Sequence, residues 1–386
     1  MRFCFVLLPT EYYSPVSGGA ISTVTMHVVR ELEQLGHDVL IIAPEDNQPE
    51  HLVGTVIHVR CNFKNRVDRI VSHLEARLRG WDCLEFGKFW RKVRQELTLF
   101  QPDVVVLAND LAASVEVRKA LPDVTLVVWL HNEFRARDTI KVTLQLVDVF
   151  LTCSNYIRNW VIREYNVNPE RVITAHAGVD KTQFYPSFSR QTKTLKMIYV
   201  GRLDPNKGVE TAVEVTRCLL NRSMPVSLTV AGHAWFYRQN NSNDEDFVRG
   251  LRCSMGVSHI EWLGHVSRRW IPALMREHDI ALVLSRSNEP FGLVVLEAMA
   301  SGLAVMASSR GGLPEACGEA GIFVDPDDGT AIAQQLESLC VDRQNLYKWQ
   351  VRSLQRAAQA SWRATTLALL RAVGAPNAEW SDEAVE

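Results

Sequence analysis

The chain has 386 residues, of which 47% are hydrophobic and 22% are charged. This length exceeds one average domain and the composition suits full hydrophobic cores, so we expect two domains of similar size. The formal net charge is -2, from 42 Lys and Arg residues and 44 Asp and Glu residues. That balance argues against a chain built mainly to coat nucleic acid, and no nucleic-acid partner is expected.

Eight cysteines are scattered along the chain without a CxxC pair. Several lie in apolar runs, where a cysteine is usually a small core residue, so reduced thiols in a cytoplasmic protein are the simplest interpretation. The start, MRFCFVLLP, has an apolar run too short for a transmembrane helix and lacks the features of a signal peptide. It predicts a buried first strand.

Short apolar runs then alternate with longer amphipathic stretches. The strand candidates of the first half are Phe3–Leu8, Val39–Ala43, Thr55–Val59, Val104–Leu107, Thr125–Leu130 and Val149–Thr152. A helical period marks the segments between them, for example Ile21–Leu35, which ends at Gly36. Apolar strands that alternate with helices are typical of a parallel sheet covered on both faces, so this half predicts a doubly wound α/β domain.

The pattern breaks in a polar segment around Pro186, which we interpret as a linker over residues 186–195. A second series of strand candidates follows, namely Met197–Val200, Ser227–Val230, His259–Leu263, Ile280–Leu284, Ala304–Ala307 and Gly321–Val324. The sequence therefore predicts Rossmann-like domains over 1–185 and 196–355 that face one cleft. The stretch Gln344–Val373 has a helical pattern, with a C-terminal helix expected over 356–374 and a flexible acidic tail over 375–386.

The first predicted strand runs into SPVSGGAIST, which places Gly18 and Gly19 before a helix. Paired glycines let backbone N–H groups approach a phosphate, and a helix N-terminus adds partial positive charge. An ordinary strand-to-helix turn explains the pair equally well. The G-x-G-x-x-G fingerprint is absent, which counts against a dehydrogenase.

The second half opens with MIYVGRLDPNKG, in which Arg202 and Lys207 lie five residues apart in a loop. Two cations from one loop could neutralise a diphosphate and stabilise it as a leaving group. The alternative is a solvated surface pair. The position at a strand end, between Gly201 and Gly208, favours the functional interpretation.

The strongest signal is the segment DIALVLSRSNEPFGLVVLEAMASG. A helix is expected to begin near Gly292, so that the N–H groups of Phe291, Gly292 and Leu293 point at an anion in the cleft. Glu289 is expected at the loop tip, where it could accept hydrogen bonds from sugar hydroxyls, and Glu297 could bind the diol of a ribose. A helix-surface role for Glu297 is the alternative, but it does not explain the loop as a whole.

With GRLDPNKG, ASSRGGLPE and the early SGG loop, EPFGLVVLE resembles the family 4 retaining glycosyltransferases of the GT-B fold. The segments LGHDVLIIAP, HAGVDKTQFYP, GHVSRRWIPALMREHD and ASWRATTLALLRAV extend the resemblance over nearly the whole chain. The resemblance implies transfer, with retention, of a hexose or N-acetylhexosamine from a UDP-sugar or GDP-mannose to a glycan, lipid-linked or small-metabolite acceptor. The first domain would bind the acceptor and the second the nucleotide sugar, and the final helix would cross back to the first domain.

The resemblance also implies roles for individual residues. The catalytic set would be His131, Glu289, Arg202 and Lys207, with His131 near the transferring sugar. From the sequence alone, His131 would be a strand-end histidine bonded to neighbouring backbone. The implied donor-binding set is Gly18, Gly19, Arg202, Lys207, His265, Val266, Glu289, Phe291, Gly292, Leu293 and Glu297.

No cofactor is expected beyond the nucleotide sugar as co-substrate, and no metal, since Asp325-Pro326-Asp327 is better interpreted as a turn. The chain departs from the family pattern at HAGVD, where Asn-Gly-Val-Asp is frequent, and at AGHAW, where Gly-Asp-Gly is frequent. His233 and Trp235 in the latter could alter donor recognition, so the donor stays open. The alternatives are a sugar-nucleotide epimerase or hydrolase on the same fold, and a non-catalytic nucleotide-sugar-binding protein.

The segment 63–100 has nine Lys or Arg residues against five Asp or Glu, interleaved with Trp81, Phe86, Phe89 and Trp90. Such a stretch can lie on an anionic membrane surface, and an ordinary helical face beside the acceptor site is the alternative. We therefore expect a cytoplasmic protein, with peripheral contact to the cytoplasmic membrane face as an open option.

Overall fold

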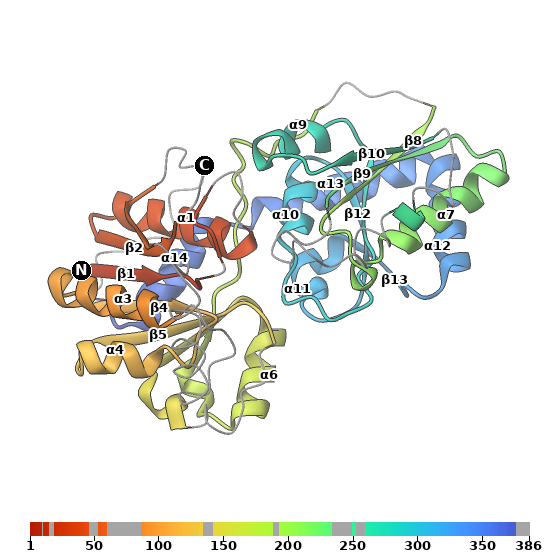
Figure 1. The fold of residues 1–386 in the computed structure, drawn as a ribbon. Helices are drawn as coiled ribbons and strands as arrows, with labels where there is room; N and C mark the ends of the chain where they lie inside the picture. The colour runs from red at the N-terminus through yellow and green to blue at the C-terminus, as the bar shows by residue number, and fades with distance from the viewer. Residues whose placement is uncertain are drawn as a thin grey trace.

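The computed structural model describes residues 1–9, 11–14, 19–45, 53–59, 86–133, 142–187, 193–233, 249–251 and 259–375. Two parallel sheets, each covered by helices, come from consecutive halves of the chain (Figure 1). The predicted pair of doubly wound units is therefore confirmed, whereas the domain limits at 185 and 196 stay predictions. In the described ranges, no helix combines the length and apolar character that a bilayer span requires.

The first sheet has seven strands in the order β3-β2-β1-β4-β5-β6-β7. They are β1 (Arg2–Val6), β2 (Asp38–Pro44), β3 (Thr55–Val59), β4 (Val104–Ala108), β5 (Thr125–Leu130), β6 (Val149–Thr152) and β7 (Val172–Thr174). The helices with them are α1 (Ala20–Gln34), α3 (Phe86–Phe100), α4 (Ser114–Ala120) and α6 (Asn155–Tyr165). Strand β4, VVVLA, is buried along its whole length because helices cover both faces of a parallel sheet.

The second sheet has six strands in the order β10-β9-β8-β11-β12-β13. They are β8 (Leu195–Val200), β9 (Val226–Ala231), β10 (Ile260–Gly264), β11 (Ile280–Val283), β12 (Ala304–Ser308) and β13 (Gly321–Val324). The helices with them are α7 (Val209–Asn221), α9 (Ile271–Met275), α10 (Leu293–Ala300), α11 (Leu313–Cys317), α12 (Gly329–Val341) and α13 (Arg343–Ala358), and α14 (Trp362–Ala372) is the last helix of the described chain. In both sheets the order reverses beside the first strand, between β1 and β4 and between β8 and β11, and ligands bind beyond the strand ends at such points.

The end of the chain differs from the expected helix. The predicted stretch Gln344–Val373 is broken at residues 359–361, so residues 356–358 belong to α13 and the last helix begins at Trp362. Ser361 caps α14 by accepting a hydrogen bond from the Ala364 N–H at 3.4 Å. Helix α14 packs against α1, β6 and β7, so it crosses back to the first half as predicted (Figure 1).

Strand β7 was not predicted. It has only three residues, VIT, and lies at the edge of the first sheet, where it pairs with β6. A run of this length carries too little periodicity to be recognised in a sequence. The tail from residue 376 and the part of the basic segment up to residue 85 lie outside the described residues.

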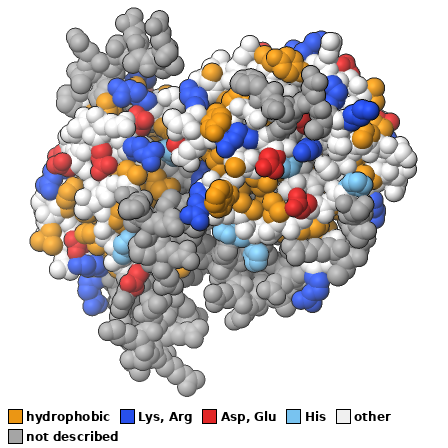
Figure 2. Space-filling model, turned by 90° about the horizontal axis from the view of Figure 1, so that it is seen from above, with side chains coloured by type: hydrophobic (Ala, Val, Ile, Leu, Met, Phe, Trp, Pro, Cys, Tyr) orange, Lys and Arg blue, Asp and Glu red, His pale blue; other side chains and the backbone are white. Residues whose placement is uncertain are grey.

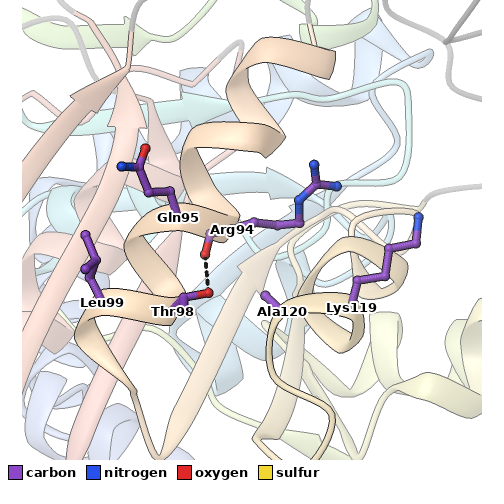
Figure 3. Close-up of a pocket in the computed structure, with 6 residues that line it drawn as sticks. All are labelled: Arg94, Gln95, Thr98, Leu99, Lys119 and Ala120. Carbon is purple, nitrogen blue, oxygen red and sulfur yellow. Dashed lines mark hydrogen bonds between the residues drawn. The ribbon is translucent and has the colours of Figure 1, made fainter.

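The described part of the basic segment is α3, and the aromatic side chains of Phe89 and Trp90 are buried. Phe89 and Trp90 are 0% and 2% exposed and belong to the core, so neither is available to a membrane surface. The outer side of α3 and α4 holds a hollow of about 400 Å³ lined by Arg94, Gln95, Thr98, Leu99, Lys119 and Ala120 (Figure 3). Figure 2 shows acidic and basic side chains intermixed on the face it presents, as the near-zero net charge suggests.

Candidate functional site

The site in the second half is built where the loops after β8 and β11 touch. Lys207 ends a short 3-10 helix, η3 (Pro205–Lys207), and Gly208 follows with φ at +74°. A Cβ at Gly208 would lie 1.8 Å from the Leu284 carbonyl oxygen, so only glycine fits there. The Asn206 carbonyl accepts a hydrogen bond from the Arg286 N–H at 2.8 Å, which fixes the two loops against each other.

This packing brings Lys207 to Glu289. Their side chains form an ion pair, and the same carboxylate oxygen accepts a hydrogen bond from the Ser285 hydroxyl at 2.7 Å. Glu289 is only 9% exposed, so the expectation of a loop-tip carboxylate is wrong. The reason lies in the backbone: Glu289 bridges to Gly311, and its carbonyl accepts a hydrogen bond from the Gly312 N–H at 2.6 Å.

Helix α10 begins at Leu293, as expected, after Gly292 with φ at +97°. Because glycine has no side chain, residue 292 cannot cap the N–H groups of the first turn, and these groups favour an anion. Glu297, in the next turn, is 6% exposed and forms an ion pair with Arg268. The sequence analysis missed Arg268, although the RR pair of GHVSRRW was the available signal.

Arg202 forms an ion pair within its own loop, between its guanidinium and the Asp204 carboxylate at 3.0 Å. Beside this loop, the His233 carbonyl accepts a hydrogen bond from the Leu203 N–H at 3.0 Å. Burial and the positive charge of the neighbouring His233 lower the pKa of His265. Arg202, His233 and His265 thus lie beyond the ends of β8, β9 and β10. Trp235 lies outside the described residues.

Val266 follows His265 and is partly buried against the hydrophobic core, so it can offer an apolar surface at the rim of the site. Phe291 is 3% exposed and belongs to the hydrophobic core.

His131 directly follows β5 of the first half and is buried. Its backbone N–H donates to the Asn109 side-chain oxygen at 2.6 Å, and its ring stacks on Trp129 with centroids 5.2 Å apart. Burial lowers the pKa of His131 to about 3, so its imidazole is neutral at neutral pH. Asn109, in a left-handed conformation with φ at +54°, is a second residue the sequence analysis missed.

Gly19 precedes α1, but its N–H already has an anionic partner. It donates to a carboxylate oxygen of Glu11 at 3.2 Å, so a phosphate at this helix would compete with Glu11. Burial raises the pKa of Glu11, although the N–H groups of Gly19 and Ser22 act in the opposite direction. Gly18 lies outside the described residues.

The two halves touch directly beside Glu289. The Ser154 hydroxyl, before α6, donates to the Pro290 carbonyl at 2.6 Å, and the His176 ring stacks on Phe291 with centroids 5.6 Å apart. A hollow of about 420 Å³ lies along α6, lined by Tyr156, Asn159, Ile162 and Arg163. The Tyr156 hydroxyl bonds Glu133, two residues after His131.

Asp325 and Asp327 lie in a turn. The Asp327 N–H donates to an Asp325 carboxylate oxygen at 3.1 Å, and both carboxylates pair with Arg310. The described residues contain no group of three His, Cys, Asp or Glu side chains arranged to hold a metal ion. The predicted turn at Asp325-Pro326-Asp327 is confirmed by the hydrogen bond of Asp327 to Asp325, whereas the expected absence of a metal ion stays a prediction.

Two Rossmann-like units and a C-terminal helix that returns to the first unit are the architecture of the GT-B fold. The model of Glycosyltransferase Family 4 matches residues 18–183, and the model of Glycosyl transferases group 1 matches residues 180–356. The chain belongs to the family 4 glycosyltransferases.

Relatives extend this comparison. Glycogen synthase of Mycobacterium tuberculosis is 25% identical over 87% of this chain and 86% of its own length. D-inositol 3-phosphate glycosyltransferase of Corynebacterium diphtheriae is 30% identical, over 53% of this chain, which spans only 51% of that enzyme. HepE of Anabaena, solved with UDP and glucose, is 18% identical and shares the fold with a TM-score of 0.75 over 97% of this chain and 100% of its own.

Proposed function

We propose that this protein is a retaining glycosyltransferase that moves a hexose or N-acetylhexosamine from a nucleotide diphosphate sugar to an acceptor hydroxyl. The observation that carries the proposal is the Lys207–Glu289 pair, which lies beside the uncapped start of α10 at the reversal point of the second sheet. A cation, free N–H groups and a carboxylate there match a diphosphate on one side and sugar hydroxyls on the other. The acceptor would be a glycan, a lipid-linked sugar or a small metabolite.

Each part of the donor has a partner of matching chemistry. Lys207 and Arg202 would bind the diphosphate, together with the N–H groups at residues 291–293. Glu289 would accept hydrogen bonds from the sugar, and Glu297 from the ribose. The base would lie near His265 and Val266. The complex of HepE with UDP and glucose supports a UDP-sugar, and GDP-mannose is the other candidate donor.

The proposed chemistry needs positioning more than it needs a strong base. The bond between the anomeric carbon and the departing phosphate oxygen breaks, and the acceptor oxygen bonds that carbon on the same face. The acceptor proton passes to the departing phosphate, so atoms and charge balance. Lys207 and the helix N–H groups would stabilise the charge that develops on the phosphate. A neutral His131 would bind a sugar hydroxyl by hydrogen bonding rather than by charge.

The proposal includes independence from metal ions and a cytoplasmic location. Cationic side chains and helix N–H groups would stabilise the leaving diphosphate in place of a metal. The free thiols of the five described cysteines suit a reducing compartment. Sedimentation with anionic liposomes at low salt would test peripheral membrane contact through residues 63–100.

A panel of nucleoside diphosphates in a thermal-shift assay tests the donor, and NMR of the product tests the stereochemistry. We expect UDP or GDP to raise the melting temperature selectively, and the product to keep the anomeric configuration of the donor. An inverted product would contradict retention. Turnover of the donor without an acceptor would favour an epimerase or hydrolase, and binding without turnover would favour a non-catalytic protein.

A further inference from the structure

The carboxylate of Glu315, in α11 of the second half, reaches the first turn of α6 in the first half. One of its oxygens accepts a hydrogen bond from the Asn155 N–H, and the other from the Tyr156 N–H, both at 2.6 Å. The first N–H groups of a helix have no partner within the helix, and negative charge is favoured there. Glu315 therefore supplies from the second half what a capping residue usually supplies locally.

The same carboxylate also holds the segment that joins the two halves. Its Oε2 accepts from His176 Nε2 at 2.9 Å, and the His176 ring stacks on Phe291. We call the bonds of Glu315 to Asn155, Tyr156 and His176 the Glu315 contact. These bonds lower the pKa of the Glu315 carboxyl although burial acts to raise it, so the group is charged at neutral pH.

Next to this contact, Ser154, which caps α6, binds the loop that carries Glu289 and Pro290, which we call the donor loop. Ser154 accepts a hydrogen bond from the Ile157 N–H at 3.1 Å and donates its own hydroxyl proton to the Pro290 carbonyl at 2.6 Å. Pro290 directly follows Glu289. The start of α6 is therefore bonded at two places to the second half, once at the donor loop and once at α11.

Glu315 is itself rigidly placed. Arg356 of α13 donates to the backbone carbonyls of Glu315 at 2.7 Å and Ala316 at 3.0 Å. Three residues before Glu315, the Gly312 N–H bonds the Glu289 carbonyl at 2.6 Å. A continuous set of bonds thus runs from α6 through Glu315 and Gly312 to Glu289.

From these bonds we infer that Glu315 is a positioning residue, which fixes the loop of Glu289 against the first half while the two halves are together. The inference rests on the proposed function, because it takes Glu289 to bind the donor sugar. If the proposed function holds, Glu315 contacts neither the donor nor the acceptor. It acts through Pro290 and Gly312, and it sets where Glu289 lies relative to His131 across the interface.

The Glu315 contact should matter for turnover more than for nucleotide binding. The groups that the proposed function assigns to the diphosphate and the ribose, such as Lys207 and Glu297, belong to the second half. Without the contact, those groups keep their places, but the first half is no longer held at the donor loop. Loss of positioning lowers the rate of transfer because the reacting groups must be held within about an ångström.

The test compares E315A and E315Q with E319Q in the full chain. Glu319 is exposed and lies four residues away, and its side chain forms no hydrogen bond or ion pair with the described part of the chain, so E319Q is the matched control. Hydrogen exchange of the Asn155 and Tyr156 amides reports the contact directly. Calorimetry with UDP and GDP reports donor binding, and turnover of the corresponding nucleotide sugar at saturation reports kcat.

In E315A we expect exchange of the two amides to be about 10-fold faster or more, because an open helix end loses protection. Nucleoside diphosphate affinity should stay within about twofold, while kcat falls about 10- to 100-fold from lost positioning. E315Q, which keeps acceptor oxygen but not charge, should lie between E315A and the wild type. E319Q should match the wild type in all three measurements.

Unchanged amide exchange and unchanged kcat in E315A would overturn the inference. An equal loss of nucleotide affinity and kcat, with a lower melting temperature, would also overturn it, because Glu315 would then be merely structural. If the wild type bound neither UDP nor GDP while E315A still exchanged faster, the Glu315 contact would stand and the proposed function would fail. The two failures are therefore distinguishable.

Discussion

Lys207 and Glu289 form an ion pair that joins the loops after β8 and β11 on either side of the reversal point in the second sheet. The two side chains are 27% and 12% exposed, so solvent screens them little. The pair lies beside the start of α10, where the N–H groups of the first turn are not capped by a side chain. A donor diphosphate would bind Lys207 while its sugar binds Glu289.

The first prediction concerns this pair. K207A should lower kcat/KM about 100- to 1000-fold, since a cation on the leaving phosphate stabilises charge that develops in the transition state. E289A should lower it by a similar factor through loss of the sugar contact. Both variants should keep the far-UV circular dichroism spectrum of the wild type. Steady-state kinetics with the donor found in the thermal-shift panel measures the effect.

K348A is the control, because Lys348 is exposed on α13 and far in sequence from both loops. It should keep wild-type kinetics. Full activity in both K207A and E289A would contradict the proposed site. If either variant failed to fold, the kinetics of E289Q would test the site instead, because glutamine preserves the shape of the side chain and removes its charge.

The second prediction assigns Glu297 to the ribose. A carboxylate that binds two ribose hydroxyls discriminates against a donor that lacks one of them, by about 1–2 kcal/mol or roughly 10-fold. Wild-type protein should therefore bind a nucleoside diphosphate about 10-fold tighter than its 2′-deoxy or 3′-deoxy analogue, and E297A should bind them about equally. Isothermal titration calorimetry with the matched ligands gives both ratios.

The assignment of Glu297 is tested by the ratio of the affinities for the nucleoside diphosphate and its deoxy analogue, not by either affinity alone. E297A also leaves the Arg268 guanidinium without its carboxylate, so affinity for every nucleotide can change. An R268A variant separates the effects, because it should change overall affinity while keeping the preference for the ribose. A preference that survives in E297A would show that another group binds the ribose.

Much of the fold follows from the sequence because parallel sheets covered on both faces need apolar strands. Strands such as β4 and β5 are buried along most or all of their length, so their composition alone distinguishes them. Strand β7 was not predicted because three residues are too few to show a hydrophobic periodicity, and its burial depends on pairing with β6. The break before Trp362 was not predicted because α14 packs on α1, β6 and β7, which lie far from it in the sequence.

The candidate site was predictable where one loop or one helix end carries the chemistry. Gly292 and the start of α10 are of this kind, because positive φ and an uncapped helix start are local properties. The burial of Glu289 was not predictable, since it depends on Gly311, more than 20 residues away, packing against its backbone. Arg268 and Glu315 were missed for the same reason: their partners lie elsewhere in the chain.

The third prediction concerns metal ions. Because side-chain cations and helix N–H groups are proposed to stabilise the diphosphate, about 10 mM EDTA should change the initial rate of transfer less than twofold. The control adds excess magnesium after EDTA, which should also leave the rate unchanged. A rate that EDTA abolishes and magnesium restores would contradict the proposed metal independence.

The fourth prediction concerns the returning helix. Trp362 is 7% exposed and stacks on His27 of α1 with ring centroids 4.6 Å apart, so it joins α14 to the first half. W362A should lower the free energy of unfolding by about 3–5 kcal/mol, from lost burial and the cavity left behind. Urea denaturation followed by circular dichroism measures the change.

Trp270 provides the matched control, since it is 58% exposed. W270A should change the free energy of unfolding by less than about 0.5 kcal/mol, as surface substitutions usually do. Equal effects of the two substitutions would contradict a structural role for the Trp362 stack.

The last prediction is the pH dependence of stability that His27 causes. Burial, followed by the positive charges of Arg30 and Arg268, lowers the pKa of His27 to about 4, against the opposing effect of Asp180. An unfolded histidine titrates near pKa 6.5, so between about pH 6.5 and 4 the unfolded chain binds a proton that the folded chain does not. Stability from this group is therefore present above pH 6.5 and lost as the pH falls, by up to about 1.4 kcal/mol per pH unit.

H27F isolates this contribution, because phenylalanine can keep the stack on Trp362 but cannot titrate. Urea denaturation at several pH values should show the free energy of unfolding falling more steeply in the wild type than in H27F between pH 6.5 and 4.5. His131, with its pKa lowered to about 3, and Asp110, with its pKa raised to about 6 by burial, titrate in both proteins and cancel in the difference. H259F, at an exposed position, should follow the wild-type curve. Parallel curves for H27F and the wild type would show that His27 is protonated in the folded chain as readily as in the unfolded one.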